Sequence, residues 1–307
     1  MSATLIDLSN ALAAATERAA TATVAVHTET RGSSSGVIWR PGVIVTTDHA
    51  LRRDEDIHVT LAGERVVPAS LVGRDPSTDL AVLKCGEAAA TVEAGNAATA
   101  RPGALVLVVG RTRASGPVAT LGVVSLVVAE RRTWSAGALA PYIRLDVALQ
   151  PTAVGGAAVD AQGNIFGIAT PRFAQFGAIA IPSATVNNVV DVVLKRGRIP
   201  RGYLGVGLQP VRLPEELRQS LQRTEKAAAI VLEVEPESPA HKAGLVIGDI
   251  LISLDGQPVT HLENVQSHLH GENIGKALAA GIIRGGAVRS VNIVVSERQP
   301  KSTEESD

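Results

Sequence analysis

Short runs of β-forming residues, broken by Gly and Pro, constrain this chain more than any other feature of its sequence. Between about residues 21 and 182 they include TATVAVHT, GVIVTT, LAVLK, ALVLVVG and GAIAIP. No helical pattern long enough for a crossover helix separates these runs. Because parallel strands need such crossovers, the pattern predicts an assembly of antiparallel β-barrels.

Helical periodicity appears on both sides of this β-rich region. Residues 1–21 predict an Ala-rich amphipathic helix whose apolar face consists of Leu5, Leu8, Leu12 and Ala15. Residues 183–199 place valines at helical spacing behind Ser183, which we expect to cap that helix. Pro200 and Gly202 follow and predict its end.

A second, smaller unit follows the second helix. Residues 203–297 alternate strand patterns such as AAIVLEVEP and DILISLDG with short helical segments such as LENVQSHLH. This mixture predicts an α+β module. The predicted organisation is an N-terminal helix at 1–21, a β-barrel domain at 22–199, an α+β domain at 200–298 and a flexible polar tail at 299–307.

Composition excludes several classes of partner. The 307 residues carry a formal net charge of -1, so no general field attracts nucleic acid. No apolar run approaches the roughly 20 residues that a membrane-spanning helix needs. The first residues lack the basic start of a secretory signal, and Cys85 is the single cysteine. These observations favour a cytoplasmic protein.

Three motifs in the β-rich region resemble the HtrA (Deg) serine proteases, which join a chymotrypsin-like double β-barrel to PDZ domains. The motifs are GVIVTTDHAL, GRDPSTDLAVLK and QPTAVGGAAVDAQGNIFGI. The resemblance covers about residues 22–297 and implies a mainly β fold, a double barrel followed by a C-terminal α+β PDZ domain. It also implies His49 as the catalytic base, Asp79 as its orienting carboxylate and residue 154 as the nucleophile position.

Residue 154 is a valine, where the family has a serine. Acyl transfer on this fold needs a hydroxyl that attacks the carbonyl while the histidine removes its proton, and an isopropyl group can do neither. The oxyanion-hole region has changed as well, because Thr152 and Ala153 stand where the family has Gly and Asn. We therefore expect a degenerate triad without proteolytic activity. Thr152 as a replacement nucleophile is the alternative within this turn.

The second unit begins with GYLGVGLQPV, which resembles the carboxylate-binding loop and first strand of a PDZ domain. In such a loop, main-chain N–H groups bind the C-terminal carboxylate of a peptide, and the next strand pairs with it. The resemblance assigns peptide binding to Tyr203, Leu204, Gly205 and Val206. Val265 and Leu269, which share a face of the following helix, could line the side-chain pocket or belong to the core.

Three functions remain open on sequence alone. The preferred one is an inactive HtrA-like protein that binds unfolded proteins or C-terminal peptides as a scaffold, chaperone-like protein or regulator of an active protease relative. The others are an endopeptidase of protein quality control with an unexpected nucleophile, and a purely structural subunit. No cofactor is expected, and no metal, because His261, His268 and His270 lack further ligands at suitable spacing. Homo-oligomerisation stays open.

Overall fold

The computed structural model describes residues 2–28, 32–51, 53–86, 100–128, 131–133, 137–139, 141–174, 176–269 and 271–298. The predicted tail at 299–307 lies outside the described residues. The chain divides into two compact units, Met1–Arg131 with Leu139–Ile199, and Arg132–Ala138 with Pro200–Asp307.

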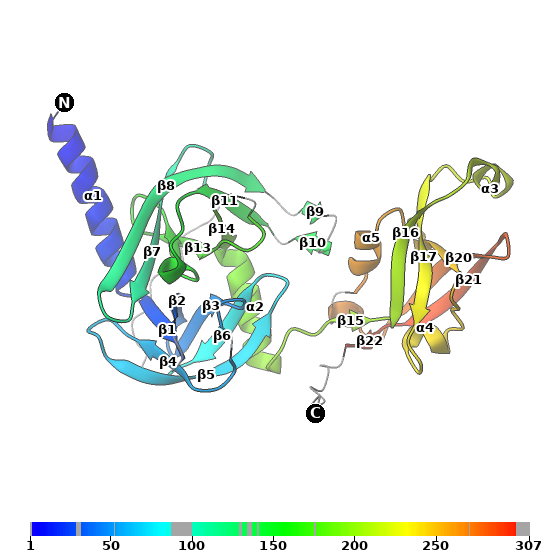
Figure 1. Cartoon of the computed structure of the whole chain (residues 1–307), viewed down its shortest axis with the longest axis horizontal. Coiled ribbons are helices and arrows are strands. Elements are labelled where there is room, and N and C mark those ends of the chain that lie inside the picture. The colour runs from blue at the N-terminus through cyan, green and yellow to red at the C-terminus, as the bar shows by residue number, and fades with distance from the viewer. Residues whose placement is uncertain are drawn as a thin grey trace. The chain divides into compact units, whose positions relative to one another are not determined.

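The described strands of the first unit close into two antiparallel barrels (Figure 1). The first barrel contains β1 (Thr23–His27), β2 (Ser33–Arg40), β3 (Val43–Thr47), β4 (Ile57–Thr60), β5 (Val66–Asp75) and β6 (Leu80–Lys84). The second contains β7 (Leu105–Thr112), β8 (Gly116–Val128), β11 (Tyr142–Asp146), β12 (Ala157–Val159), β13 (Ile165–Thr170) and β14 (Ala178–Pro182). A separate two-stranded sheet joins β9 (Arg131–Thr133) to β10 (Gly137–Leu139). The predicted double barrel is confirmed.

A hydrophobic core lies between the two barrels, and two helices pack against it. Val45 of the first barrel and Val109 of the second share this core. Ala15 of α1 (Ser2–Ala20) and Val190 of α2 (Ser183–Arg196) are fully buried in it. The predicted apolar face of α1 is thus buried only at its C-terminal half, since Leu5 and Leu8 are 69% and 43% exposed.

Helix α2 begins without the predicted Ser cap. Its N-cap residue is Pro182, and no side chain caps the helix. The reason is that β14 continues up to Pro182, which pairs with Gly167 of β13, so the helix starts directly from the strand. Ser183 is therefore the first helical residue rather than the residue before it.

The second unit is the predicted mixed α+β module. Its strands are β15 (Gly202–Tyr203), β16 (Val206–Arg212), β17 (Ala227–Val234), β18 (Ile250–Leu254), β19 (Gln257–Pro258), β20 (Ala277–Arg284), β21 (Ala287–Val294) and β22 (Ser296–Glu297). Its helices are α3 (Glu215–Ser220), α4 (Pro239–Lys242), α5 (Leu262–Gln266) and the 3-10 turn η3 (Gly271–Asn273). The sheet order β16-β17-β18-β20-β21 places β16 and β21 at its two edges, and β15 pairs with β22.

Candidate functional site

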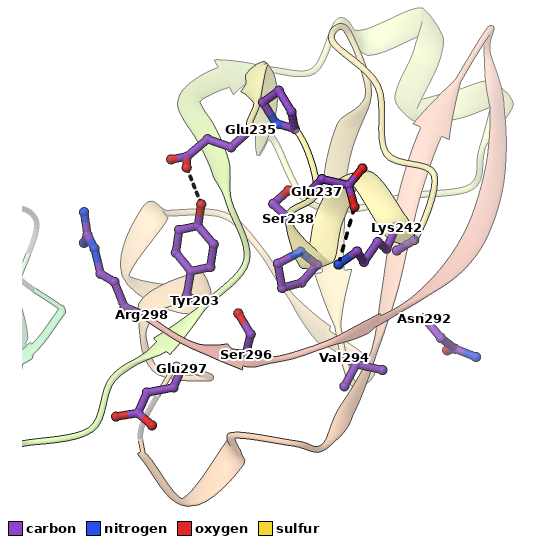
Figure 2. Close-up of a pocket in the computed structure, with 13 residues that line it drawn as sticks. Tyr203, Glu235, Glu237, Ser238, Lys242, Asn292, Val294, Ser296, Glu297 and Arg298 are labelled. Carbon is purple, nitrogen blue, oxygen red and sulfur yellow. Dashed lines mark hydrogen bonds and ion pairs between the residues drawn. The ribbon is translucent and has the colours of Figure 1, made fainter. Parts of the chain in front are cut away.

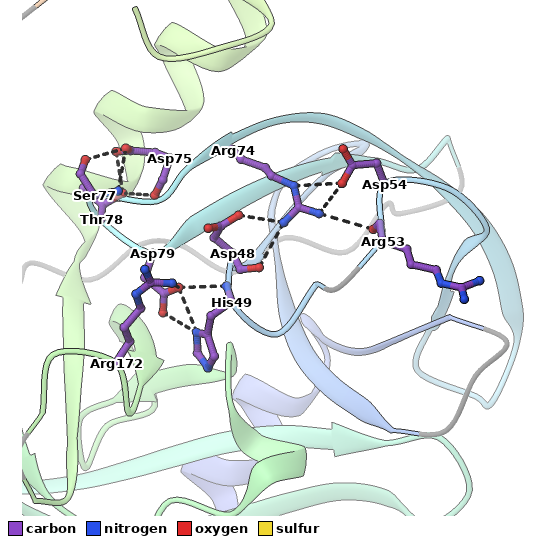
Figure 3. Close-up of polar contacts among 10 residues, drawn as sticks. All are labelled: Asp48, His49, Arg53, Asp54, Arg74, Asp75, Ser77, Thr78, Asp79 and Arg172. Atoms are coloured by element: carbon purple, nitrogen blue, oxygen red, sulfur yellow. Dashed lines mark hydrogen bonds and ion pairs between the residues drawn. The ribbon is translucent and has the colours of Figure 1, made fainter. Parts of the chain in front are cut away.

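His49 and Asp79 lie in direct contact in the first barrel (Figure 3). His49 follows β3 and Asp79 precedes β6, and these two strands pair with each other. Nδ1 of His49 lies 2.9 and 2.8 Å from the two carboxylate oxygens of Asp79, and the His49 N–H donates to Oδ1 at 3.0 Å. The structure therefore brings together the residues predicted as base and orienting carboxylate.

The Asp79 carboxylate is fully buried and has further polar partners. The hydroxyl of Thr170, on β13, donates to Oδ2 at 2.6 Å, and Nη1 of Arg172 lies 3.7 Å from Oδ1. Such contacts are needed because a buried charge without partners is strongly unfavourable. Sequence analysis missed Thr170 and Arg172, because a contact across 91 positions leaves no local pattern.

The other ring nitrogen of His49 faces a different situation. A serine protease uses this atom, Nε2, to remove the proton of the nucleophile. Among the described residues no hydroxyl forms a hydrogen bond with Nε2, since the hydrogen bonds of this ring join Nδ1 to the Asp79 carboxylate. The Thr152 hydroxyl, the alternative nucleophile, is thus not bonded to His49.

Arg74 holds the loop that carries His49. Its Nη1 donates to Asp48 Oδ1 at 2.8 Å, and its Nη2 donates to Asp54 Oδ1 at 2.5 Å (Figure 3). Because Asp48 and Asp54 lie on either side of His49 within one loop, the guanidinium connects both parts of that loop to β5. This contact restrains the backbone from which the imidazole projects.

Val154 follows a tight 3-10 turn, η2 (Pro151–Ala153). Its backbone is extended, with φ -62° and ψ 129°, and the residue is only 8% exposed. Gly155 then takes φ +81°, and a Cβ there would lie 2.3 Å from the Ser35 main-chain oxygen. The turn thus keeps its requirement for glycine although residue 154 is not a serine.

Main-chain hydrogen bonds place this turn next to the His49–Asp79 pair. Ser35 N–H donates to the Val154 carbonyl at 2.7 Å, and the hydroxyl of Thr46, three residues before His49, donates to the Ser35 carbonyl at 2.7 Å. On the other side, Gly155 N–H donates to the carbonyl of Ala169 at 2.8 Å, next to Thr170. Residue 154 therefore lies between the segments that carry His49 and the partner of Asp79.

The predicted oxyanion-hole region forms a closed turn. Val154 N–H donates to the Pro151 carbonyl at 3.3 Å, and Ala153 N–H donates to Gln150 at 2.9 Å. The Thr152 carbonyl accepts a 2.6 Å hydrogen bond from the Ser35 hydroxyl. An oxyanion hole on this fold uses the N–H group at the nucleophile position and the N–H group two residues before it. Of these two, the N–H group of Val154 is used within the turn.

In the second unit, Leu204 and Gly205 connect β15 to β16. Their carbonyls accept hydrogen bonds from the N–H groups of Ala240 and Glu235, both at 2.9 Å. Gly205 has φ +75°, and a Cβ there would lie 2.2 Å from the Ser238 side chain. Within the described part of the chain, the N–H groups of Leu204 and Gly205 have no hydrogen-bond partner. A loop with free N–H groups and inward carbonyls is suited to bind an anion.

Some of the residues predicted to bind a peptide are buried in the core of the second unit, and others are partly exposed at its edge. Leu204 and Val265 are buried, at 3% and 4% exposure, whereas Val206 and Leu269 are partly buried against the same core. β16 forms an edge of the sheet, so its open side is available for another strand. Burial, together with the hydrogen bond that its hydroxyl donates to Glu235, raises the pKa of Tyr203 to about 12.

Among the described residues, no group of three or more His, Cys, Asp or Glu side chains could hold a metal ion. His270, one of the three histidines considered above, lies outside the described residues. The helices that the structure describes include none long and apolar enough to cross a membrane.

Comparison with known proteins places both units in families. Residues 34–168 match the trypsin-like peptidase domain, and residues 202–295 match the PDZ domain. A probable periplasmic serine endoprotease, DegP-like, of Brucella suis biovar 1 is 32% identical over 271 residues, which are 86% of this chain and 52% of that protein. The corresponding protein of Pseudomonas putida is 32% identical over 274 residues, 87% of this chain and 56% of that protein. The chain thus spans about half the length of these relatives.

Solved structures of similar proteins cover nearly the whole chain. The HtrA-type protease AlgW with a decapeptide is 28% identical with a TM-score of 0.75, covering 94% of this chain and 99% of that one. An AlgW variant with a tripeptide is 30% identical with a TM-score of 0.76, covering 94% of this chain and 98% of that one.

The prediction of a cytoplasmic location is wrong, because the DegP-like relatives are named periplasmic endoproteases and point to the periplasm. The prediction rested partly on the single cysteine. A lone buried thiol such as Cys85 has no intramolecular disulfide partner in any compartment, so it does not distinguish a reducing from an oxidising one.

The peptidase match, the PDZ match and the likeness to AlgW over almost the full length agree with one another. They also agree with the order of a double barrel followed by a small mixed domain. This chain belongs to the HtrA family of serine proteases.

Proposed function

We propose that this protein is a proteolytically inactive HtrA family member that binds unfolded segments or C-terminal peptides. Its role is that of a scaffold, a chaperone-like protein or a regulator of an active relative. The observation that carries the proposal is Val154, which stands where the family resemblance assigns the nucleophile and lies between the His49 loop and β13. We infer a periplasmic setting from the names of the DegP-like relatives, which cell fractionation can test.

The surrounding chemistry supports the loss of proteolysis. Val154 offers neither a lone pair for attack nor a proton for His49 to remove. The N–H group of Val154 also donates within its own turn, so the stabilisation of an oxyanion is weakened as well. Proteases that lose one triad side chain keep at most an acceleration of roughly 10³ to 10⁴ over the reaction in water. This remaining activity depends on an intact oxyanion hole.

The PDZ domain supports the binding part of the proposal. The free N–H groups at Leu204 and Gly205 could receive a terminal carboxylate, and the open edge of β16 could pair with the peptide behind it. Val206 and Leu269 lie partly exposed at the rim of the core, where a ligand side chain would pack. AlgW, a relative of similar structure, has been solved with bound peptides.

Restoration of the active site tests the catalytic part. We expect the wild-type chain to leave casein intact and to resist labelling by a fluorophosphonate. A quadruple variant with Val154→Ser, Thr152→Gly, Ala153→Asn and Ala157→Pro should then cleave casein, and adding His49→Ala should abolish that cleavage. Casein cleavage by the wild-type chain that disappears with His49→Ala would contradict the proposal.

The alternatives give different outcomes in the same set of measurements. An endopeptidase with an unexpected nucleophile would form an acyl-enzyme adduct, which peptide mass mapping would locate. A purely structural subunit would neither cleave casein nor bind a peptide with a free C-terminus. For the proposed function, binding of such a peptide should be lost in Gly205→Val, because the added side chain collides with Ser238.

A further inference from the structure

β21 forms the edge of the PDZ sheet opposite β16, and half of its main-chain groups face outward. Val295, which follows the strand, donates its N–H to Lys276 and accepts from Gly275 at its carbonyl, so its main chain faces the β20 side. Main-chain direction alternates along a strand. The N–H and C=O groups of Val288, Ser290, Asn292 and Val294 therefore point to the open side.

The position beside this open edge is already partly filled by a strand. β15 pairs with β22 in antiparallel register, Tyr203 opposite Ser296, on the side away from β20. The chain then turns away at Leu204 and Gly205 to begin β16. From Val294 back to Val288 the edge has no partner strand within the described residues, over a length of about 20 Å.

A pocket of about 880 Å³ lies where the missing strand would continue the line of β15 (Figure 2). Asn292, Val294 and Ser296 line one wall. The main chains of Asn292 and Val294 point outward without a partner strand among the described residues, whereas Ser296 already pairs with Tyr203. The turn before α4 and the residues Lys242 and Ala243 line the other wall. Because α4 packs against β21 and also borders this space, the space suits a single strand rather than the edge of another sheet.

The edge lacks the features that usually prevent strand addition. β21 pairs with β20 over eight residues without a bulge, and it contains no proline. Its sole charged residue is Arg289. Val288 and Val294 are 51% and 55% exposed, so β-branched side chains are presented to solvent at both ends. Exposed edges of this kind pair with other strands.

The charges of the pocket select the kind of segment. Its lining includes three carboxylates, Glu235, Glu237 and Glu297, against two cations, Lys242 and Arg298. Lys242 is paired with Glu237 at 3.7 Å. An acidic lining disfavours a terminal carboxylate, which sets this pocket apart from the loop at Gly205.

We propose that the groove between β21 and α4 is a second strand-addition site, which takes an interior, extended segment of a polypeptide with neutral or basic side chains. The segment adds to the sheet through the outward N–H and C=O groups of β21. It needs no free C-terminus. Glu235 and Ser238 line this groove and also hydrogen-bond the Gly205 carbonyl, so an occupant contacts residues that hold the carboxylate-binding loop.

Fluorescence anisotropy with a blocked peptide tests this site. The probe is a fluorescein-labelled octapeptide that alternates Val with Ser and Thr and ends in an amide, so that the Gly205 loop has no carboxylate to bind. The wild-type chain should bind it, and Asn292→Pro should weaken binding by about tenfold or more, since main-chain hydrogen bonds at the edge are lost. Asn292→Ala, the matched control, should stay within about twofold, because it keeps the N–H group.

Two further measurements test whether the variants remain folded and which of the two grooves binds the probe. The N–H group of Asn292 faces away from β20, so proline there removes no ladder hydrogen bond, and the melting temperature should stay near that of Asn292→Ala. Leu269→Ala changes the predicted peptide pocket beside β16 but does not line this groove, so this variant should still bind the amidated probe. A probe N-methylated at alternate residues should not bind. Equal binding by Asn292→Pro and wild type, or loss of binding in Leu269→Ala, would overturn the proposal. A dimer in sedimentation that Asn292→Pro dissociates would assign the edge to a second copy and would overturn it as well.

Discussion

Replacement of Thr170 by valine removes one hydroxyl from a buried network without changing the shape of the side chain. The Thr170 hydroxyl donates to the Asp79 carboxylate at 2.6 Å and accepts from the Arg172 N–H at 3.0 Å. A hydrogen bond to a charged group contributes about 1.5 to 3 kcal/mol, and a neutral one about 0.5 to 1.5 kcal/mol. We therefore expect Thr170→Val to lower the free energy of unfolding of the first unit by about 2 to 4 kcal/mol.

Urea unfolding followed by tryptophan fluorescence measures this change. The chain has two tryptophans, and Trp39 is 8% exposed in the core between the barrels. A Trp134→Phe background leaves Trp39 as the single reporter of the first unit. Thr170→Ser is the matched control, because it keeps the hydroxyl and removes one buried methyl group, at a cost of about 1 kcal/mol.

The comparison of the two variants decides the result. If Thr170→Val and Thr170→Ser are equally stable, the Thr170 hydroxyl does not stabilise the Asp79 carboxylate, and the expected contribution of this hydrogen-bond network is refuted. A larger decrease in the free energy of unfolding for Thr170→Val than for Thr170→Ser would show that the Asp79 carboxylate depends on a contact from the second barrel. The His49–Asp79 pair would then be maintained by the packing of both barrels, although residue 154 is a valine.

Two further predictions concern backbone and pH. Gly155→Ala should lower the melting temperature more than Gly63→Ala: both glycines have positive φ, but only at Gly155 would the new Cβ meet backbone at 2.3 Å. Equal losses would contradict this. Burial, with the charges of Arg113 and His58, lowers the pKa of His27 below 6.5. The unfolded chain then binds more protons just below pH 6.5, so stability should fall as the pH drops below 6.5 and the fall should be smaller in His27→Gln. Identical pH profiles for the two proteins would refute this.

Much of the first unit follows from local patterns. The β-rich runs between Gly and Pro became antiparallel strands, since neither their length nor their spacing allows crossover helices. His49 and Asp79 were singled out from motifs, and the structure brings them within hydrogen-bond distance. The start of α2 is the position where the local pattern gave a wrong prediction. Ser183 resembles a capping residue, but β14 continues directly into the helix.

Other features depend on contacts between distant segments. Thr170 and Arg172 meet Asp79 across 91 and 93 positions, and neither carries a motif of its own. The apolar stripe of α1 is continuous in sequence, yet Ala15 is buried and Leu5 is exposed, because the barrels cover only part of the helix. Likewise, the sequence VRSVNIVV predicts a strand but not its place in the sheet, and only the sheet order shows that this strand lies at an edge.

The sequence by itself determined that residue 154 has no hydroxyl, since side-chain chemistry is a property of one position and no fold can supply the missing oxygen. It also determined the antiparallel barrels, because the period of apolar residues and the placement of Gly and Pro act locally. Only the tertiary structure decided which N–H groups are free at Gly205, which face outward along β21, and which donate within the turn at Val154. Hydrogen-bond partners depend on how segments far apart in the chain pack together, and no local pattern encodes that arrangement.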